Sequence, residues 1–176
     1  MRNRAMRWCA IMLAAAAPAD GASNAVLTVG EFDGARFERP VTRAWATVAA
    51  VPSPGVTGVV QEITWQGVAI RVQYGAFESA AAAHAAALAH VAGTAAGFQQ
   101  GLWSHARLPA IGDESWWTRG SGAHALLIRS ENVCALIGCR GGDAETRDRV
   151  AETFAARIAA KARTARRVAL PPDTVP

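Results

Sequence analysis

Several side chains that could carry chemistry lie between residues 105 and 139 of this chain. His105, Asp113 and His124 are residue types used in acid–base catalysis, and Cys134 and Cys139 are residue types used as nucleophiles or metal ligands. No H-x-H, H-x-x-x-H or C-x-x-C spacing occurs, so a metal site would need residues from distant parts of the chain. The sequence therefore predicts no metal and no cofactor.

Catalytic motifs are missing as well. Gly120-Ser121-Gly122 lacks the G-x-S-x-G pattern, and it joins two predicted strands where that motif needs a strand-to-helix turn. Asp113 and Glu114 are adjacent, so in a strand their side chains diverge and cannot serve one substrate bond. We assign no catalytic residue and expect a protein that is not an enzyme. The alternatives are a small periplasmic hydrolase that uses His124, His105 or Asp113, and a thiol-dependent protein.

The spacing of Cys134 and Cys139 argues against a disulfide between them. Residues five apart in a regular strand point to opposite faces, with Cα atoms about 16 Å apart at about 3.3 Å per residue, whereas a disulfide needs them within about 7 Å. A bridge would require Ala135 to Gly138 to form a turn, and these residues lack turn chemistry. We expect free thiols, with Cys134 the more accessible of the two.

The tryptophan pair Trp116-Trp117 is the clearest candidate for binding. Adjacent residues of a strand place one ring on each face of a sheet. A two-residue return loop after the strand would put Trp117 in the core with Leu126 and Trp116 on the open face, and a three-residue loop would reverse them. In either arrangement one ring is exposed or is covered by the loop of residues 99–111, and an exposed ring would be an aromatic platform for a ligand or partner. The residues expected around it are Arg71, Arg129, Leu127, Leu136 and Cys134.

A hairpin from Ala123 to Cys139 must position these residues. Two apolar runs flank a short polar loop with Glu131-Asn132 at its tip, and asparagine tolerates positive φ. The resulting register pairs Ser130 with Val133, Ile128 with Ala135, Leu126 with Ile137 and His124 with Cys139. The hairpin is therefore expected at the centre of the sheet.

The flanking segments predict a second hairpin and two helices. Residues 59–74 alternate in polarity around a Gln66-Gly67 turn, and Pro52-Ser53-Pro54-Gly55 reads as a loop, while residues 41–51 fit a helix and a strand equally well. Residues 77–98 predict a helix whose apolar stripe includes His84 and Leu88, with His90 on another face. A third strand follows at Ser115 to Arg119.

The last helix is expected to start at Asp143 as its N-cap and to end near Arg166. Its inward stripe is Val150, Phe154, Ile158, Ala162 and Ala165. Together these elements predict an α+β fold with an antiparallel sheet of about five strands and two helices packed on one face. The opposite face of the sheet would be open to solvent or to a partner.

The first residues predict a Sec-type export signal, and so a periplasmic or secreted protein. Three arginines precede an apolar run from Trp8 to Ala17 that is too short to span a bilayer. Ala17-Pro18-Ala19 fits a cleavage site, with Ser23-Asn24-Ala25 as the competitor. The expected organisation is a signal peptide at 1–19, a strand and loop segment at 20–58, an α+β core at 59–167 and a flexible tail at 168–176.

Removal of the leader also removes most of the net charge. Of the 18 Lys and Arg residues three are lost and none of the 14 acids is, so the expected mature charge is 15 − 14 = +1. This charge supports neither a nucleic-acid partner nor stable membrane insertion after signal removal.

The order of these elements, with an I-G-D-E-x-W turn before the central hairpin and an amphipathic last helix, resembles small exported bacterial α+β domains of the PsbP-like kind. The resemblance covers roughly residues 59–166 and implies an accessory or binding role outside the cytoplasm, without assigning functional residues. The function expected is non-enzymatic binding of an unknown protein or small ligand on the open sheet face. Substitution of Trp116, Trp117 or Arg129 should then alter partner capture without unfolding the domain.

Overall fold

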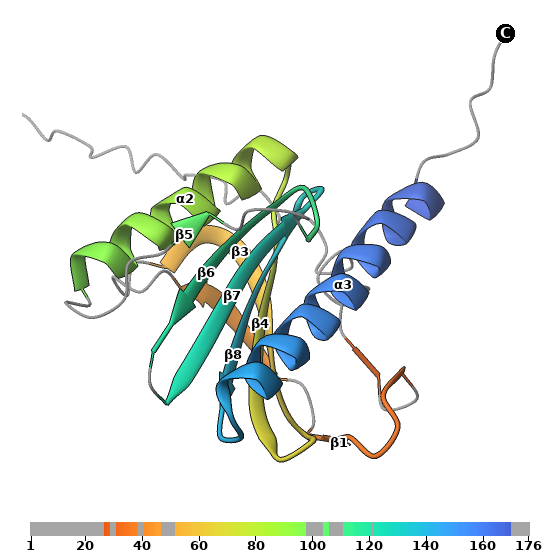
Figure 1. The fold of residues 1–176 in the computed structure, drawn as a ribbon. Coiled ribbons are helices and arrows are strands. Elements are labelled where there is room, and N and C mark those ends of the chain that lie inside the picture. Colours follow the sequence, from red (N-terminus) through yellow and green to blue (C-terminus); the bar gives the residue numbers. More distant parts are fainter. Residues whose placement is uncertain are drawn as a thin grey trace, which may run out of the picture.

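The computed structural model describes residues 27–28, 31–38, 41–46, 52–97, 104–105, 111–120 and 122–169. The expected signal peptide and the last residues of the expected tail lie outside these ranges. Within them, one antiparallel sheet separates two helices, α2 and α3 (Figure 1).

The predicted α+β class is confirmed, with more strands than the five expected. Eight strands pair in the order β1-β3-β4-β8-β7-β6-β5, with β2 also pairing with β3. The elements are β1 (Arg36–Phe37), β2 (Val41–Ala46), β3 (Pro52–Trp65), β4 (Val68–Ala76), α2 (Ala80–Gly97), β5 (Ser104–His105), β6 (Glu114–Arg119), β7 (Ala123–Ser130), β8 (Val133–Arg140) and α3 (Ala144–Ala169).

The central hairpin of β7 and β8 has the predicted register. Ser130 faces Val133 and His124 faces Cys139, and every pair between them falls as expected. The residue with positive φ is Glu131, at 56°, and not Asn132. The Asn132 side chain instead donates to the Phe77 carbonyl over 2.7 Å. This bond links the β7–β8 turn to the residues just before α2.

The second hairpin, β3 and β4, also has its predicted turn, because Trp65 faces Val68 across Gln66-Gly67. Its first strand is longer than expected. Pro52 to Gly55 belong to β3 and not to a loop. The undecided segment before it contains the strand β2, which pairs with the beginning of β3. On its other side β3 pairs with β4 only from Gly58 to Trp65, so Pro52 and Pro54 lie where one side of the strand is an edge, a position that tolerates proline.

One face of the sheet, the inner face, packs against α3 and forms the main core. The predicted stripe of α3 is buried at Val150, Phe154, Ile158 and Ala162, and the side chain of Ala165 lies outside the described part. Asp143 caps the helix as expected, because its carboxylate accepts from the Thr146 backbone N–H at 2.7 Å.

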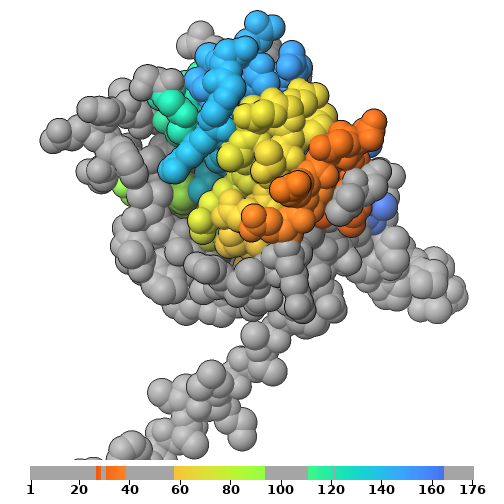
Figure 2. Space-filling view, turned by 90° about the horizontal axis from the view of Figure 1, so that it is seen from below, coloured from red at the N-terminus to blue at the C-terminus, as the bar shows by residue number. Residues whose placement is uncertain are grey.

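The N-terminal segment closes this core from the side. The Phe32 ring stacks on Phe154 with centroids 4.2 Å apart. Gln61 donates to the Leu27 carbonyl at 2.9 Å and accepts from the Tyr74 hydroxyl at 3.0 Å. Burial raises the pKa of Tyr74, so this hydroxyl stays protonated. Figure 2 shows the segment, in orange, lying beside the yellow β3–β4 hairpin.

The two helices cover opposite faces of the sheet, which corrects the expectation that both would lie on one face (Figure 1). The side of α2 that faces the sheet is formed by Ala83, Ala87 and His90, all buried. The predicted stripe was wrong, because His84 and Leu88 are exposed. Alanines occur all round this helix, so its apolar pattern does not select one face.

Candidate functional site

The outer face of the sheet, on the side of α2, consists of four cross-strand rows. Their residues follow from the strand register. The first row is Arg36, Thr64, Ala69, Arg140 and Ala123; the second is Glu62, Arg71, Gly138, Ala125 and Thr118; the third is Val60, Gln73, Leu136, Leu127 and Trp116; the fourth is Gly58, Gly75, Cys134, Arg129 and Glu114. We call the first two rows the open half and the last two the covered half.

The two halves differ in how much of their side chains is exposed to solvent. Every residue of the first row is exposed, and Arg71 in the second row has 57% of its side chain exposed. In the covered half Trp116, Leu127 and Cys134 are buried beneath Phe77, Ala83 and Ala87. The helix α2 therefore seals one end of the outer face and leaves the other end open.

The predicted aromatic platform is not exposed at either ring. Trp116 and Trp117 are each only 5% exposed. As the shorter return loop predicted, Trp117 lies beside Leu126 in the inner core, and Trp116 is on the outer face, where α2 covers it. The aromatic platform is therefore corrected, and α2 is the element that covers the outer ring: both indoles fill space between the sheet and a helix.

The other predicted binding residues lie in three different settings. Leu127 is fully buried and Leu136 is partly buried against the α2 cluster. Arg129 has only 14% of its side chain exposed. Arg71 lies on the open half, paired with Glu62 at 3.3 Å. Of the predicted set, Arg71 is the exposed member and Leu136 borders the open half.

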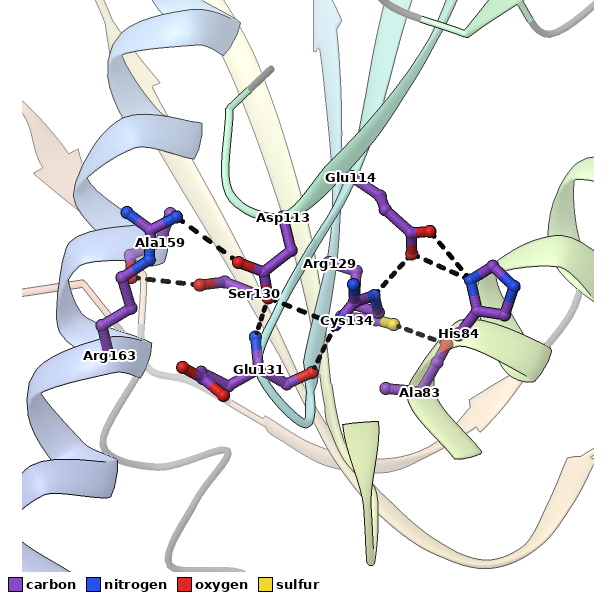
Figure 3. A network of polar contacts seen from close by, with 10 residues as sticks. All are labelled: Ala83, His84, Asp113, Glu114, Arg129, Ser130, Glu131, Cys134, Ala159 and Arg163. Carbon is purple, nitrogen blue, oxygen red and sulfur yellow. Dashed lines mark hydrogen bonds and ion pairs between the residues drawn. The ribbon is translucent and has the colours of Figure 1, made fainter. Parts of the chain in front are cut away.

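A polar network at the covered end has Arg129 as its centre (Figure 3). The guanidinium donates to Glu114 through Nε, and through Nη1 to Asp113 at 3.2 Å and to the Glu131 carbonyl at 3.0 Å. His84 of α2 contacts the Glu114 carboxylate at 2.9 Å. These bonds fasten α2 and the β7–β8 turn to the start of β6.

The network continues over the end of the sheet to the other helix. Asp113 accepts from the Glu131 backbone N–H at 2.7 Å and from Arg163 of α3 at 3.5 Å. Figure 3 shows this chain of contacts running from α2 to α3. Burial by itself would raise the pKa of Glu114, but the hydrogen bonds and charges of Arg129 and His84 outweigh burial and lower it. The carboxylate is thus held ionised as a structural link.

Glycine is required in the turn that starts this network. Gly112 has φ of +80°, and a Cβ there would lie 2.5 Å from the Arg129 carbonyl oxygen. The Asp113 backbone N–H donates to that same oxygen at 2.8 Å. The I-G-D-E segment therefore brings two acids to Arg129. The expectation that their side chains diverge was wrong, because Asp113 lies in the turn before β6 and not in the strand. One sequence feature could have predicted this contact with Arg129. Gly112 is followed by two acids, and the strand register places Glu114 opposite Arg129.

A second polar cluster lies at the other end of the inner face. His124, only 4% exposed, hydrogen bonds through Nδ1 to Asp148 at 2.7 Å. Arg119 donates to the same carboxylate at 3.0 Å and stacks over the Trp117 ring at 4.4 Å. These contacts tie the β6–β7 connection to the first turns of α3, so His124 has a structural role in this geometry.

The structure does not bring Asp113 and His124, the two proposed acid–base residues whose side chains it describes, together. Asp113 bonds to the backbone and side chain of Arg129, five residues from His124 along β7, a separation of about 16 Å in a strand. The backbone of His105 pairs with Trp116, and its side chain lies outside the described part. No group of three His, Cys, Asp or Glu residues suited to a metal ion occurs among the described residues.

Both cysteines are free thiols on opposite faces of β8. Cys139 belongs to the inner core and Cys134 to the cluster under α2, where its thiol donates to the Ala83 carbonyl at 3.3 Å. The expectation that Cys134 is accessible was wrong, because α2 buries it completely. Burial raises the pKa of each thiol to about 12, so neither is ionised near neutral pH.

Comparison with known proteins finds a solved structure of similar fold but no matching protein family. No family model matches the sequence, and no curated protein matches it. Among solved structures, the extracellular domain of PknH from Mycobacterium tuberculosis is similar, with a TM-score of 0.53 and 12% identity over 84% of this chain and 97% of that chain. This likeness concerns the fold. The PsbP-like resemblance remains a prediction from sequence.

One further feature concerns membranes. No helix in the described ranges combines the length and apolarity needed to cross a bilayer.

Proposed function

We propose that this protein is a non-enzymatic binding or accessory domain that acts outside the cytoplasm, in the periplasm or as a secreted protein. Its partner, a protein or a small ligand, contacts the open half of the outer sheet face. The observation that carries the proposal is that α2 covers only two of the four rows on this face, while the first row is exposed throughout. The leader-like residues 1–19 support export.

The proposed surface differs from the one expected around the tryptophans. Trp116, Trp117 and Leu127 are buried and support the fold, and Arg129 is engaged in the polar network. Arg71 keeps its proposed binding role, and Leu136 supports the surface from its border with the covered half. The binding surface is thus shifted along the strands, away from α2.

A pair of photo-crosslinking residues tests this proposal. Ala69 on the open half and Ala156 on the outer side of α3 are both exposed alanines, so a photoreactive amino acid at either position should not disturb the core. In the exported fraction of the native cell we expect a discrete crosslinked product from position 69 and none from position 156. Equal products from both positions, or a product from position 156 alone, would contradict the proposed surface.

A further inference from the structure

We infer that the partner presents an acidic, extended segment to the open half. This inference rests on the proposed function and adds the chemistry of the partner. Three arginines, Arg36, Arg71 and Arg140, lie on the open half. Its acids are Glu62 and, at the edge of the second row, the exposed Glu38, whose backbone N–H donates to the Glu62 carbonyl. This surface therefore carries 3 − 2 = +1. Charge complementarity therefore selects a negatively charged occupant.

The arginines are spaced for several contacts along one segment. Arg71 faces Gly138, and Arg140 is its diagonal neighbour on β8, a spacing of about 7–8 Å. Arg36 is separated from Arg140 by β3 and β4, so the two are about 14 Å apart at about 4.8 Å per strand. An extended peptide of about four residues covers this distance at about 3.3 Å per residue.

The floor between the arginines allows close approach. Gly138 lies in the middle of β8, and a Cβ there would meet only the Arg71 carbonyl oxygen, at 3.8 Å. The strand geometry therefore does not require glycine at this position. Its partner on β7, Ala125, and its diagonal neighbour on β4, Ala69, are also small, so a peptide backbone can lie close to the sheet.

The acid that pairs with Arg71 does not block this surface. Glu62 pairs with Arg71 at 3.3 Å, with 45% and 57% of the two side chains exposed. Ion pairs this exposed are weak, so a carboxylate of the partner can replace Glu62 as the ligand of the guanidinium. Bidentate arginine–carboxylate contacts give the bound segment its position.

The residue types on the open half favour an acidic protein segment over a membrane or a nucleic acid. None of its ten residues is aromatic or a large aliphatic residue. Peripheral membrane binding needs apolar side chains to enter the lipid, and single-stranded nucleic acids need aromatic side chains on which the bases stack. An acidic peptide needs neither.

Titration with a model peptide tests the inference. The probe is a fluorescent peptide of alternating Glu and Ala residues, and the control probe replaces Glu with Gln. We expect saturable binding of the acidic probe to the mature protein, weakened by salt, and weakened about tenfold in Arg71→Glu and Arg140→Glu. Arg71→Gln and Arg140→Gln should bind more tightly than the Glu variants but less tightly than the wild type. Such a loss would show that the arginine itself is needed, and that repulsion by the new glutamate is not the whole effect.

Arg157→Glu is the matched control, because Arg157 is exposed on α3, away from the sheet. Its affinity should stay within about twofold of the wild type. Equal loss in Arg157→Glu, or equal binding of the Gln probe, would overturn the inference. If the protein binds vesicles of anionic lipid, if Arg71→Glu abolishes this binding, and if the acidic peptide does not bind, the inference is overturned in favour of a membrane.

Failure of the inference can be separated from failure of the proposed function. If the crosslinked product from position 69 persists unchanged in Arg71→Glu and Arg140→Glu, the open half still binds a partner, but not through an acidic segment. If that product is absent in the wild type, the proposed function itself fails.

Discussion

The covered and open halves of the outer face are formed by the same strands but differ in the side chains that these strands direct outward. Along β6 the outward residue changes from Trp116 to Thr118, and along β7 from Leu127 to Ala125. Large apolar side chains occur where α2 lies above the sheet, and small or charged ones occur where it does not. The covered end of these strands therefore contributes to stability, and the open end is the proposed binding surface.

The comparison has an energetic basis. Burying a large apolar side chain contributes about 1.5–3 kcal/mol, whereas an exposed polar or charged residue contributes about 0–0.5 kcal/mol. The covered half should therefore tolerate few changes, while the open half can vary with little effect on folding. Four predictions compare matched residues in the two halves, or at their edge, in order of expected effect.

Replacement of Trp116 should have the largest effect. Trp116→Ala removes an indole that is 5% exposed beneath α2, and we expect a loss of about 3–5 kcal/mol in the free energy of unfolding. Thr118→Ala, on the same strand and face in the open half, should cost less than about 0.5 kcal/mol. Urea denaturation measures both. A small loss for Trp116→Ala would mean that α2 does not seal this end.

The two arginines Arg129 and Arg71 provide the second comparison. Arg129→Met leaves two carboxylates without their shared donor, so we expect a loss of about 1–3 kcal/mol. Arg71→Met breaks an exposed pair and should cost less than about 0.5 kcal/mol. Thermal unfolding of the two variants tests this difference, which equal losses would contradict.

The pH dependence of stability should identify Glu114. Its pKa in the folded protein lies below its ordinary value of 4.5, so its stabilising contribution is present above that value. The contribution is lost as the pH falls through the folded pKa. We expect the melting temperature of the wild type to fall more steeply below pH 4.5 than that of Glu114→Gln.

Glu31 and Asp143 also have lowered pKa values, so Glu114→Gln should keep part of the acid dependence. Glu62→Gln, in the open half, is the matched control and should follow the wild-type curve. Coincident curves for Glu114→Gln and the wild type would show that the network adds nothing at acid pH.

Gly138→Ala should give the smallest effect of the four predictions, and Gly112→Ala provides its contrast. Gly138→Ala adds a methyl group to open surface and restricts the unfolded chain, so we expect a gain of about 0.4–1 kcal/mol. Gly112→Ala forces a Cβ towards the Arg129 carbonyl at positive φ and should cost about 1–3 kcal/mol. Chemical denaturation measures both. Destabilisation by Gly138→Ala would show that the floor of the open half is already filled.

The sequence was most informative where short-range patterns decide the structure. Both hairpin registers followed from alternating polarity and two-residue polar turns, and the α3 stripe followed from three large apolar residues and an alanine at helical spacing. The face of α2 could not be predicted, because a helix of alanines has no dominant apolar side. The placement of the indoles depended on the length of one loop, and only the covering helix determined that both would be buried.

The site could be predicted only in part, because its residues come from distant segments. Arg71 was expected on a polar sheet face, and it lies there. The contact of His84 with Glu114 joins residues 30 positions apart. Arg36 reaches the open half through a two-residue strand in the segment expected to hold a strand and a loop, but its place beside β3 was not predicted. Surfaces assembled in this way follow from topology, which sequence periodicity does not encode.

The central claim is that the open half is the binding surface, and filling its floor tests the claim most directly. Gly138→Leu places a side chain above the small residues there, and Ala156→Leu on α3 is the matched control. The measurement is the yield of crosslinked partner from position 69 in folded protein. We predict a drop of about tenfold for Gly138→Leu and no change for Ala156→Leu. An unchanged yield in Gly138→Leu would contradict the account.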